Sequence, residues 1–400
     1  MLTLLKNHIS KFGYFGLSLT SLIFAVRPVW LSTYAGDDWP NSQTPDLIRW
    51  RYGTNNFLNW WSETAFWNEQ WFIGQGRIYS IQFLENRLIF STLQTERQYK
   101  FLQTFLVFLV GILIAYVIYL ATRNLILAST AIALYSSILQ IRLDFDPHLA
   151  FGGMLQSMIL KIFLTIIISY HYIRKPSKIK GFFIVFVWIA ALQTYEYSWL
   201  TLPGVIFLLL AILKQSKIDL VGKALNSFKV VLASLSIPLF LFAITVFGYL
   251  KPKAIGVSEA YKFSFSYPES VEIYLQQTYA ALPGSVDRIL FIPVDFGNKE
   301  ISFRAIFIII ALLIHLTMTF FQGKTEISNL AKVYILLSGV FLFLSPGLVL
   351  AGQPVWWELF NWGNSYLGVF VGEIGLVLIL VILYQLASDL IRYLVKDQRV

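Results

Sequence analysis

The amino-acid sequence predicts an all-α polytopic integral membrane protein with about ten transmembrane helices. The first observation is composition: 57% of the 400 residues are hydrophobic and 13% are charged, whereas soluble domains carry roughly 25% charged residues. The second is that apolar runs of about 20 residues, long enough to cross the ~30 Å hydrocarbon layer, recur along the whole chain. Together these observations exclude an ordinary soluble domain.

Apolar windows predict where the spans lie along the chain. The windows 182–195 and 198–213 are short, and together they can form one hairpin with its tip at Tyr195-Glu196-Tyr197. The complete set of predicted spans is 12–34, 101–121, 125–142, 155–172, 182–195, 198–213, 230–250, 304–321, 333–351 and 368–386.

The distribution of charge predicts the orientation of these spans. With the N-terminus in the cytoplasm, about half of the 31 Lys and Arg residues fall in cytoplasmic segments. The acids in those segments are only Asp219, Glu326, Asp389 and Asp397. The positive-inside rule therefore predicts a multi-pass protein of the cytoplasmic (inner) membrane with both termini cytoplasmic. The net charge of +9 then faces the anionic lipids of the inner membrane surface, and no nucleic-acid partner is expected.

Two long segments are predicted on the outer side. Residues 35–100 are rich in Trp and contain two stretches with helical apolar spacing, Leu47–Phe66 and Ile78–Phe90, which suit helices lying at the membrane interface. The second segment, residues 251–303, contains four prolines and both acidic and basic residues. The expected organisation is a transmembrane core at 1–250 that includes the first outer loop, an outer loop at 251–303, and C-terminal transmembrane helices with a cytoplasmic tail at 304–400.

A pair of carboxylates, Asp37 and Asp38, directly follows the first predicted span. Near low-dielectric surroundings a carboxylate can have the raised pKa that a general base needs to take a proton from an attacking hydroxyl. Adjacent residues of an extended chain point to opposite sides, so one of the two is expected to reach a substrate. The alternative is a helix cap or a solvated loop end.

The stretch Asp144-Phe145-Asp146-Pro147-His148 lies at the outer end of the third predicted span. In an extended segment Asp144 and Asp146 lie on one face, where they could bind a divalent cation or hold a sugar. His148 adds a third polar group beside them. A solvated turn that begins at Asp146-Pro147 is the alternative.

Glu196 lies between Tyr195 and Tyr197 at another outer span end, and ionisable groups at membrane depth usually face a cavity. A carboxylate beside aromatic rings suits sugar binding, and a structural Glu bonded to Tyr is an equal alternative. Outer-side bases could hold phosphate, because the Arg fork binds two oxygens at once. The candidates are Arg77, Arg142, Arg288, Lys251 and Lys253. Each of them could instead contact headgroups or pair with an acid. Lys161, inside a span, is expected either to snorkel or to pair internally.

Motifs of several other classes are absent from the sequence. It contains no P-loop, no Gly-x-Gly-x-x-Gly fingerprint, no Gly-x-Ser-x-Gly elbow and no His-Glu-x-x-His. Because cysteine is also absent, disulfides, zinc-thiolate sites and thiol nucleophiles are excluded.

The chain has a first span, then an Asp-Asp pair, then a long loop with two predicted interfacial helices, and then many spans. This order resembles the GT-C superfamily of membrane glycosyltransferases, and most closely the bacterial polyprenyl-phosphate-sugar-dependent enzymes of the O-antigen glucosyltransferase type. The resemblance covers roughly residues 12–213. A large soluble C-terminal domain is missing, so protein modification of the oligosaccharyltransferase type is less expected. The residues that carry the resemblance are Gly36-Asp37-Asp38-Trp39, Gly76-Arg77, Asp144 with Asp146, and Gln193-Thr194-Tyr195-Glu196.

The resemblance implies an inverting glycosyltransferase that moves a single sugar from a polyprenyl-phosphate donor to a glycan or glycolipid acceptor on the outer face of the membrane. Asp37 or Asp38 would be the catalytic base, and the outer-side bases would stabilise the departing phosphate. Asp144 and Asp146 would hold a divalent cation, Mg²⁺ or Mn²⁺, if one is used. The sugar- or acceptor-binding side chains would be Glu196, Tyr195, His148 and Trp39.

Two alternatives stay open. A glycan ligase or polymerase would use a diphosphate-linked donor and move a whole oligosaccharide. A flippase or transporter for lipid-linked glycans would also need a charged, aromatic outer cavity. Transporters usually place ionisable residues near the bilayer midplane, whereas nearly all the acids of this chain fall at outer span ends, which favours an enzyme.

Overall fold

The structure is a computed structural model in which every element of the described part is a helix. This agrees with the predicted all-α class. The described residues are 2–75, 77–139, 148–149, 153–245, 264–283, 299–321, 326–354, 357 and 368–397.

Seven helices of the described part are long and apolar enough to cross a membrane, which makes the chain a polytopic membrane protein. Each of them coincides with one of the predicted windows. They are α1 (Leu2–Leu31), α6 (Glu96–Thr122), α8 (Met154–Arg174), α12 (Lys223–Ala243), α16 (Lys299–Phe321), α17 (Asn329–Ala351) and α18 (Val369–Asp397).

The other three predicted spans correspond to shorter helices. These are α7 (Leu125–Ile138), α9 (Lys178–Leu192) and α11 (Leu202–Gln215), of 14, 15 and 14 residues. At 1.5 Å per residue they are about 21–23 Å long, less than the ~30 Å hydrocarbon thickness. They pack between longer helices: α7 contacts α1, α6, α16 and α18, and α11 contacts α6, α8 and α17. The prediction of ten spans is therefore supported for seven.

The structure has a turn between two helices where the central hairpin was predicted, but the two helices pack mainly on other elements, α9 on α8 and α12, and α11 on α17, α6 and α8. Helix α9 ends at Leu192, a single turn of helix, α10 (Tyr197–Leu200), follows, and α11 then runs back. Pro203, in the first turn of α11, occupies the position where the missing N–H costs nothing. The residues between α9 and α10 place Tyr195 and Glu196 in this turn.

The first outer loop folds into α2 (Asp38–Ser42), α3 (Thr44–Tyr52), α4 (Phe57–Gln75) and α5 (Ser80–Thr92). The predicted helix Ile78–Phe90 matches α5 within two residues. The predicted helix Leu47–Phe66 is wrong as a single element, because the chain breaks at Gly53, whose φ of +79° is left-handed. Asn56 then begins α4 by accepting a hydrogen bond from the Asn59 N–H at 3.0 Å.

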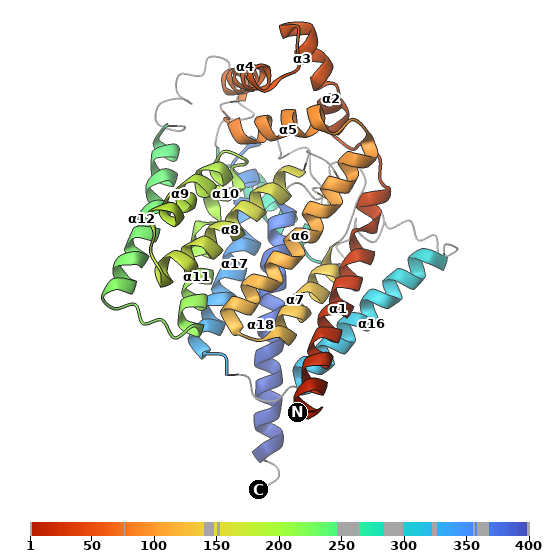
Figure 1. Ribbon diagram of the computed structural model, residues 1–400, viewed down its shortest axis with the longest axis vertical. Helices are drawn as coiled ribbons and strands as arrows, with labels where there is room; N and C mark the ends of the chain where they lie inside the picture. The colour runs from red at the N-terminus through yellow and green to blue at the C-terminus, as the bar shows by residue number, and fades with distance from the viewer. Residues whose placement is uncertain are drawn as a thin grey trace.

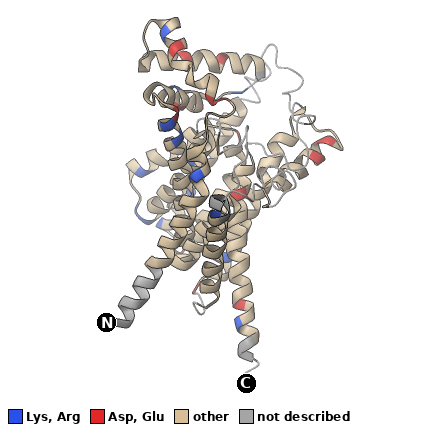
Figure 2. Cartoon of the chain, turned by 90° about the vertical axis from the view of Figure 1, so that its right-hand side faces the viewer, with Lys and Arg blue, Asp and Glu red and all other residues tan. Residues whose placement is uncertain are grey.

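Helices α2 to α5 cover one end of the helical bundle, and both chain termini lie at the opposite end (Figure 1). In the described part most of the acidic residues lie toward the end away from the termini (Figure 2). One continuous hydrophobic core includes Leu22 of α1 and Ile382 of α18, and both helices pack on α7 and α16. The amphipathic helix α14 (Glu269–Ala280) packs on α17.

The closest approach between long helices is that of α17 and α18, where glycines meet. A Cβ atom built on Gly375 would lie 2.6 Å from the carbonyl oxygen of Gly339, and one on Gly339 would lie 2.9 Å from that of Gly375. Small residues let the backbones of membrane helices come this close. This contact holds the first turns of α18 against the middle of α17.

Candidate functional site

Asp37 and Asp38 lie in a tight turn between α1 and α2. The turn passes through Gly36, whose φ of +53° is left-handed, and the Asp38 N–H donates to the Ala35 carbonyl at 3.1 Å. A carboxylate oxygen of Asp38 in turn accepts from the Ala35 N–H at 3.3 Å. This geometry directs the two adjacent carboxylates into different surroundings.

The Asp38 carboxylate is fully buried and bonded by residues of α6. The Tyr99 hydroxyl donates to one of its oxygens at 2.5 Å, and the Lys100 ammonium lies 3.3 Å from the other. Lys100 also donates to the Gln103 side-chain oxygen at 3.0 Å and to the Leu149 carbonyl at 2.6 Å. A buried charge needs this kind of pairing and hydrogen bonding to be tolerated. Asp38 is therefore a residue that fixes the turn.

The Asp37 carboxylate, in contrast, is exposed. It makes no hydrogen bond or ion pair with the residues that the structure describes, and it does not cap α2 through its side chain. The surrounding protein still removes part of its water, and this desolvation raises the pKa of the Asp37 carboxyl above its ordinary value. Of the two predicted catalytic carboxylates, only Asp37 can meet a substrate without breaking a buried ion pair.

A second buried pair continues from this cluster into the last span. Leu149, whose carbonyl binds Lys100, follows His148, and the His148 Nε2 lies 3.1 Å from a carboxylate oxygen of Glu373 in α18. Both side chains of this pair are 1% exposed. His148, predicted to contact sugar, is thus enclosed by protein in this structure. Glu373 was not singled out in the sequence, although a lone carboxylate inside the last apolar run is an available signal.

Arg77 and Glu196, two further candidates, form an ion pair of 2.6 Å, and each side chain is 11% exposed. Arg77 also donates to the side-chain oxygen of Gln353 at 3.0 Å, which connects it to the end of α17. The Tyr79 hydroxyl donates to the other oxygen of Glu196, and its ring stacks on Tyr195 with centroids 5.4 Å apart. Tyr195 is buried in this stack, so it shapes the cluster from within.

Helix α5 separates the two clusters. Tyr79, directly before α5, belongs to the Arg77–Glu196 cluster, while Phe90 near its other end stacks on Tyr99, with centroids 4.9 Å apart, beside Asp38. Eleven helical residues span about 16 Å. The two clusters therefore lie at the end of the bundle that α2 to α5 cover, about one short helix apart.

An open pocket of about 480 Å³ lies among α2, α3, α5 and the start of α6, beside the Asp38 cluster. Its wall includes Tyr34 and Glu96, whose carboxylate accepts from the Tyr34 N–H, together with the Phe90 ring and the Asn55 amide. Asn55 is held by the Trp60 indole N–H at 2.5 Å and by the Ser91 hydroxyl at 3.1 Å. Aromatic rings beside a carboxylate and an amide form a surface that suits a polar, hydroxylated ligand.

Of the remaining predicted site residues, the structure describes only Trp39. Trp39 is 64% exposed on α2, and its ring contacts Tyr34 edge-on with centroids 6.5 Å apart. Lys161 pairs internally, one of its two predicted alternatives, with Glu85 of α5 at 2.6 Å. No group of three or more potential metal ligands occurs among the described residues. The predictions for Arg142, Asp144, Asp146, Lys251, Lys253 and Arg288 lie outside the described residues.

Comparison of the chain with protein-family models, with curated proteins and with solved structures gave no match. The functional argument therefore depends on the charge, burial and contacts of the residues above.

Proposed function

We propose that the chain is an inverting membrane glycosyltransferase of the GT-C type. It transfers a single sugar from a polyprenyl-phosphate donor to a glycan or glycolipid acceptor, and Asp37 is its general base. The observation that carries this proposal is the contrast between an exposed Asp37 carboxylate and the buried, paired Asp38 beside it. The proposed setting is the inner membrane, with both termini cytoplasmic and α2 to α5 on the outer side.

Asp37 has the two properties that a general base needs. Its carboxylate is accessible, and partial desolvation raises its pKa, which strengthens it as a proton acceptor. The turn that holds it is fixed by the buried Asp38–Lys100 pair, so the carboxylate is positioned before a substrate binds.

The proposed step is a displacement at the anomeric carbon. The acceptor hydroxyl transfers its proton to Asp37 while its oxygen forms a bond to the anomeric carbon. The bond from that carbon to the phosphate oxygen breaks with inversion, and polyprenyl phosphate leaves with the electron pair. Because the donor carries its own leaving group, the reaction needs no nucleotide site, in keeping with the absence of such motifs.

The leaving phosphate requires positive charge at the outer end. Arg77 is the candidate base within the described residues, where Glu196 and Gln353 fix its guanidinium. Because its cluster lies about one short helix from the Asp38 cluster, the proposed step requires the two clusters to approach each other when the donor binds. A phosphate would compete with Glu196 for this fork, and the charge that Glu196 now neutralises would then serve the leaving group. Arg142, Arg288, Lys251 and Lys253 remain proposed as further phosphate contacts, and Asp144 with Asp146 as ligands of an optional Mg²⁺ or Mn²⁺.

The second candidate is a flippase or transporter for lipid-linked glycans. The buried His148–Glu373 pair favours it, because ionisable pairs inside spans often mark a transport pathway. A diphosphate-dependent glycan ligase would use the same outer clusters with a larger donor.

The test is donor consumption by the full chain purified in detergent. Polyprenyl-phosphate hexoses and pentoses are offered singly with a membrane glycan extract, and mass spectrometry follows the release of polyprenyl phosphate. Wild type and Asp37→Ala are compared with and without EDTA. Release by wild type alone supports the proposal, and loss of release in EDTA assigns a cation. No release from any donor in the presence of acceptor would favour the ligase and then the flippase.

A further inference from the structure

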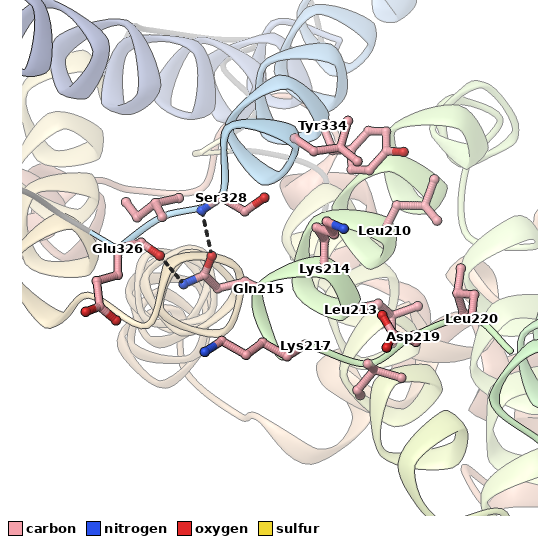
Figure 3. Close-up of a pocket in the computed structure, with 13 residues that line it drawn as sticks. Leu210, Leu213, Lys214, Gln215, Lys217, Asp219, Leu220, Glu326, Ser328 and Tyr334 are labelled. Carbon is pink, nitrogen blue, oxygen red and sulfur yellow. Dashed lines mark hydrogen bonds between the residues drawn. The ribbon is translucent and has the colours of Figure 1, made fainter.

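Two adjoining pockets are lined by residues from the ends of α8 and α11, the starts of α12 and α17 and the segments beside them. These helix ends lie on the side of the bundle where both chain termini are found (Figure 1). The first pocket has a volume of about 510 Å³ and is drawn in Figure 3. Its wall carries both signs of charge, from Lys214 and Lys217 and from Asp219 and Glu326. We call it the mixed pocket, and its balanced charge gives it no preference for an anion.

The second pocket, which we call the basic pocket, has a volume of about 520 Å³ and shares only Ile218 with the first. It lies between the end of α8 and the start of α12. Its charged side chains are Arg174 and Lys223, and its described lining contains no Asp or Glu. Apolar side chains make up the rest of the wall with two polar ones, Asn226 and Ser227. This pocket favours an anion that carries apolar groups.

The starts of two parallel helices strengthen the positive potential at the basic pocket. Helix α12 begins with Lys223 and has no acid in its first turn, and α9, which begins two residues after Pro176 of the pocket wall, likewise has none. The Trp188 indole N–H of α9 donates to the Leu235 carbonyl of α12 at 2.8 Å, which fixes the two helices side by side. The N-terminal end of a helix carries partial positive charge, so the helix dipole repels the ammonium group of Lys223. An anion bound here would stabilise both helix ends and the lysine.

Ser227 provides a second, independent observation. It lines the basic pocket, is 7% exposed, and its hydroxyl makes no hydrogen bond with the residues that the structure describes. Because Ser227 lines the pocket, its hydroxyl can bond to a ligand oxygen there without giving up a bond within the described residues. The fold around it is held by Arg123, which donates to the Tyr170 and Ser216 side chains at 2.7 and 2.9 Å.

We propose that the basic pocket binds the headgroup phosphate of an anionic phospholipid from the termini-side leaflet. Arg174, Lys223 and the Ser227 hydroxyl would contact the phosphate oxygens. The acyl chains would lie along α12, where Ile237, Phe240 and Leu241 form an exposed apolar face. These exposed apolar side chains farther along the same helix favour a lipid over free phosphate as the occupant. This proposal is independent of the glycosyltransferase activity.

The test is native mass spectrometry of the full chain in detergent, after incubation with phosphatidylglycerol and phosphatidylcholine of matched acyl chains in equal amounts. We expect wild type to retain phosphatidylglycerol preferentially. Arg174→Gln with Lys223→Gln should reduce this retention about tenfold or more, because two charge-assisted contacts are lost. Lys214→Gln in the mixed pocket is the matched control and should retain lipid like wild type.

Three outcomes would overturn the proposal. They are equal retention of the two lipids, equal loss in the Lys214→Gln control, and displacement of phosphatidylglycerol by inorganic phosphate at similar concentration, which would make the site one for a free anion. If the double variant does not fold, Lys223→Gln alone is used, since it removes a charge that opposes the helix dipole and leaves the first turn intact. Unchanged retention in that folded variant also overturns the proposal.

Discussion

The Lys100 ammonium lies 3.3 Å from a carboxylate oxygen of Asp38, and the two side chains are 1% and 0% exposed. The pair joins the first residue of α2 to the first turns of α6, so it fixes the outer layer on the bundle. Breaking a buried pair leaves an uncompensated charge, whereas a satisfied pair contributes little net stability. The importance of this contact therefore lies in the geometry that it imposes on Asp37.

Removing one partner of this pair should strongly destabilise the protein. We expect Asp38→Asn and Lys100→Met each to lower the free energy of unfolding by about 3–5 kcal/mol, and the double variant by less than the sum. Thermal and denaturant unfolding in detergent would measure this. Asp46→Asn is the matched control, because its exposed pair with Arg49 contributes about 1 kcal/mol or less. If the losses of the two single variants simply added in the double variant, that result would contradict the assignment of Asp38 and Lys100 as a buried ion pair.

Asp37→Asn should abolish sugar transfer without loss of stability. Loss of a general base typically lowers the rate by about 10²–10⁴-fold. Because the exposed carboxylate has no described partner, its replacement breaks no buried contact. The rate of polyprenyl phosphate release and the unfolding temperature would be measured on the same preparation. Glu69→Gln, an exposed acid on α4, is the control that should keep full activity. Substantial transfer by Asp37→Asn would exclude Asp37 as the base.

The raised pKa of Asp37 predicts a specific pH dependence. As a base, Asp37 acts only when ionised, so transfer should fall as the pH drops through a pKa above that of an ordinary Asp. The contribution of Asp37 to the stability of the protein should depend on pH in the opposite direction. Because burial raises the folded-state pKa, the contribution of Asp37 is full at low pH and is lost as the pH rises through that pKa. Asp37→Asn should therefore be at least as stable as wild type at neutral pH. A rate profile that is flat over this range would contradict the prediction.

The sequence predicts the local features of the site better than its contacts. The apolar spacing of α5 and the turn at Tyr195–Glu196 were predicted within two residues or directly, because both depend on neighbouring residues. The break at Gly53 was missed because apolar spacing continues on both sides of it. The Asp38–Lys100 pair joins residues 62 positions apart, and it depends on which helix α2 packs against. No local pattern could distinguish the buried Asp38 from the exposed Asp37.

Two residues other than glycine have a left-handed backbone conformation, and replacing each of them by glycine should change the stability of the protein in opposite directions. Lys217 and Arg123 have φ values of +53° and +54°, a conformation that costs roughly 1–2 kcal/mol for residues with a Cβ atom. Lys217→Gly should therefore stabilise the protein slightly, by up to about 1 kcal/mol. Arg123→Gly should destabilise it, because the Arg123 guanidinium bonds to Tyr170 and Ser216. Thermal unfolding of both variants is the measurement, and a shift of the same sign and size in both would contradict the argument.

The glycine contact between α17 and α18 should not tolerate a methyl group. A Cβ atom on Gly375 would lie 2.6 Å from the Gly339 carbonyl oxygen, so Gly375→Ala must separate the helices. We expect a loss of about 1–3 kcal/mol, the usual cost of overpacking. Gly16→Ala in α1 is the control, because nothing lies within 4 Å of its Cβ position. That change should be neutral or stabilise by up to about 1 kcal/mol. Equal stability of the two variants would show that α17 and α18 are not packed this closely.

The short helix α9 has a consequence for the lipid around the protein. It has 15 residues, about 22 Å in length, and exposes Phe182, Phe183 and Phe186, whereas α6 has 27 residues and measures about 40 Å. A bilayer adapts to such hydrophobic mismatch by thinning beside the shorter element. The protein should therefore sit in a membrane of uneven thickness, with the two headgroup planes closest to each other on the α9 side. A carrier lipid arriving from that side would have less hydrocarbon between its headgroup and the midplane.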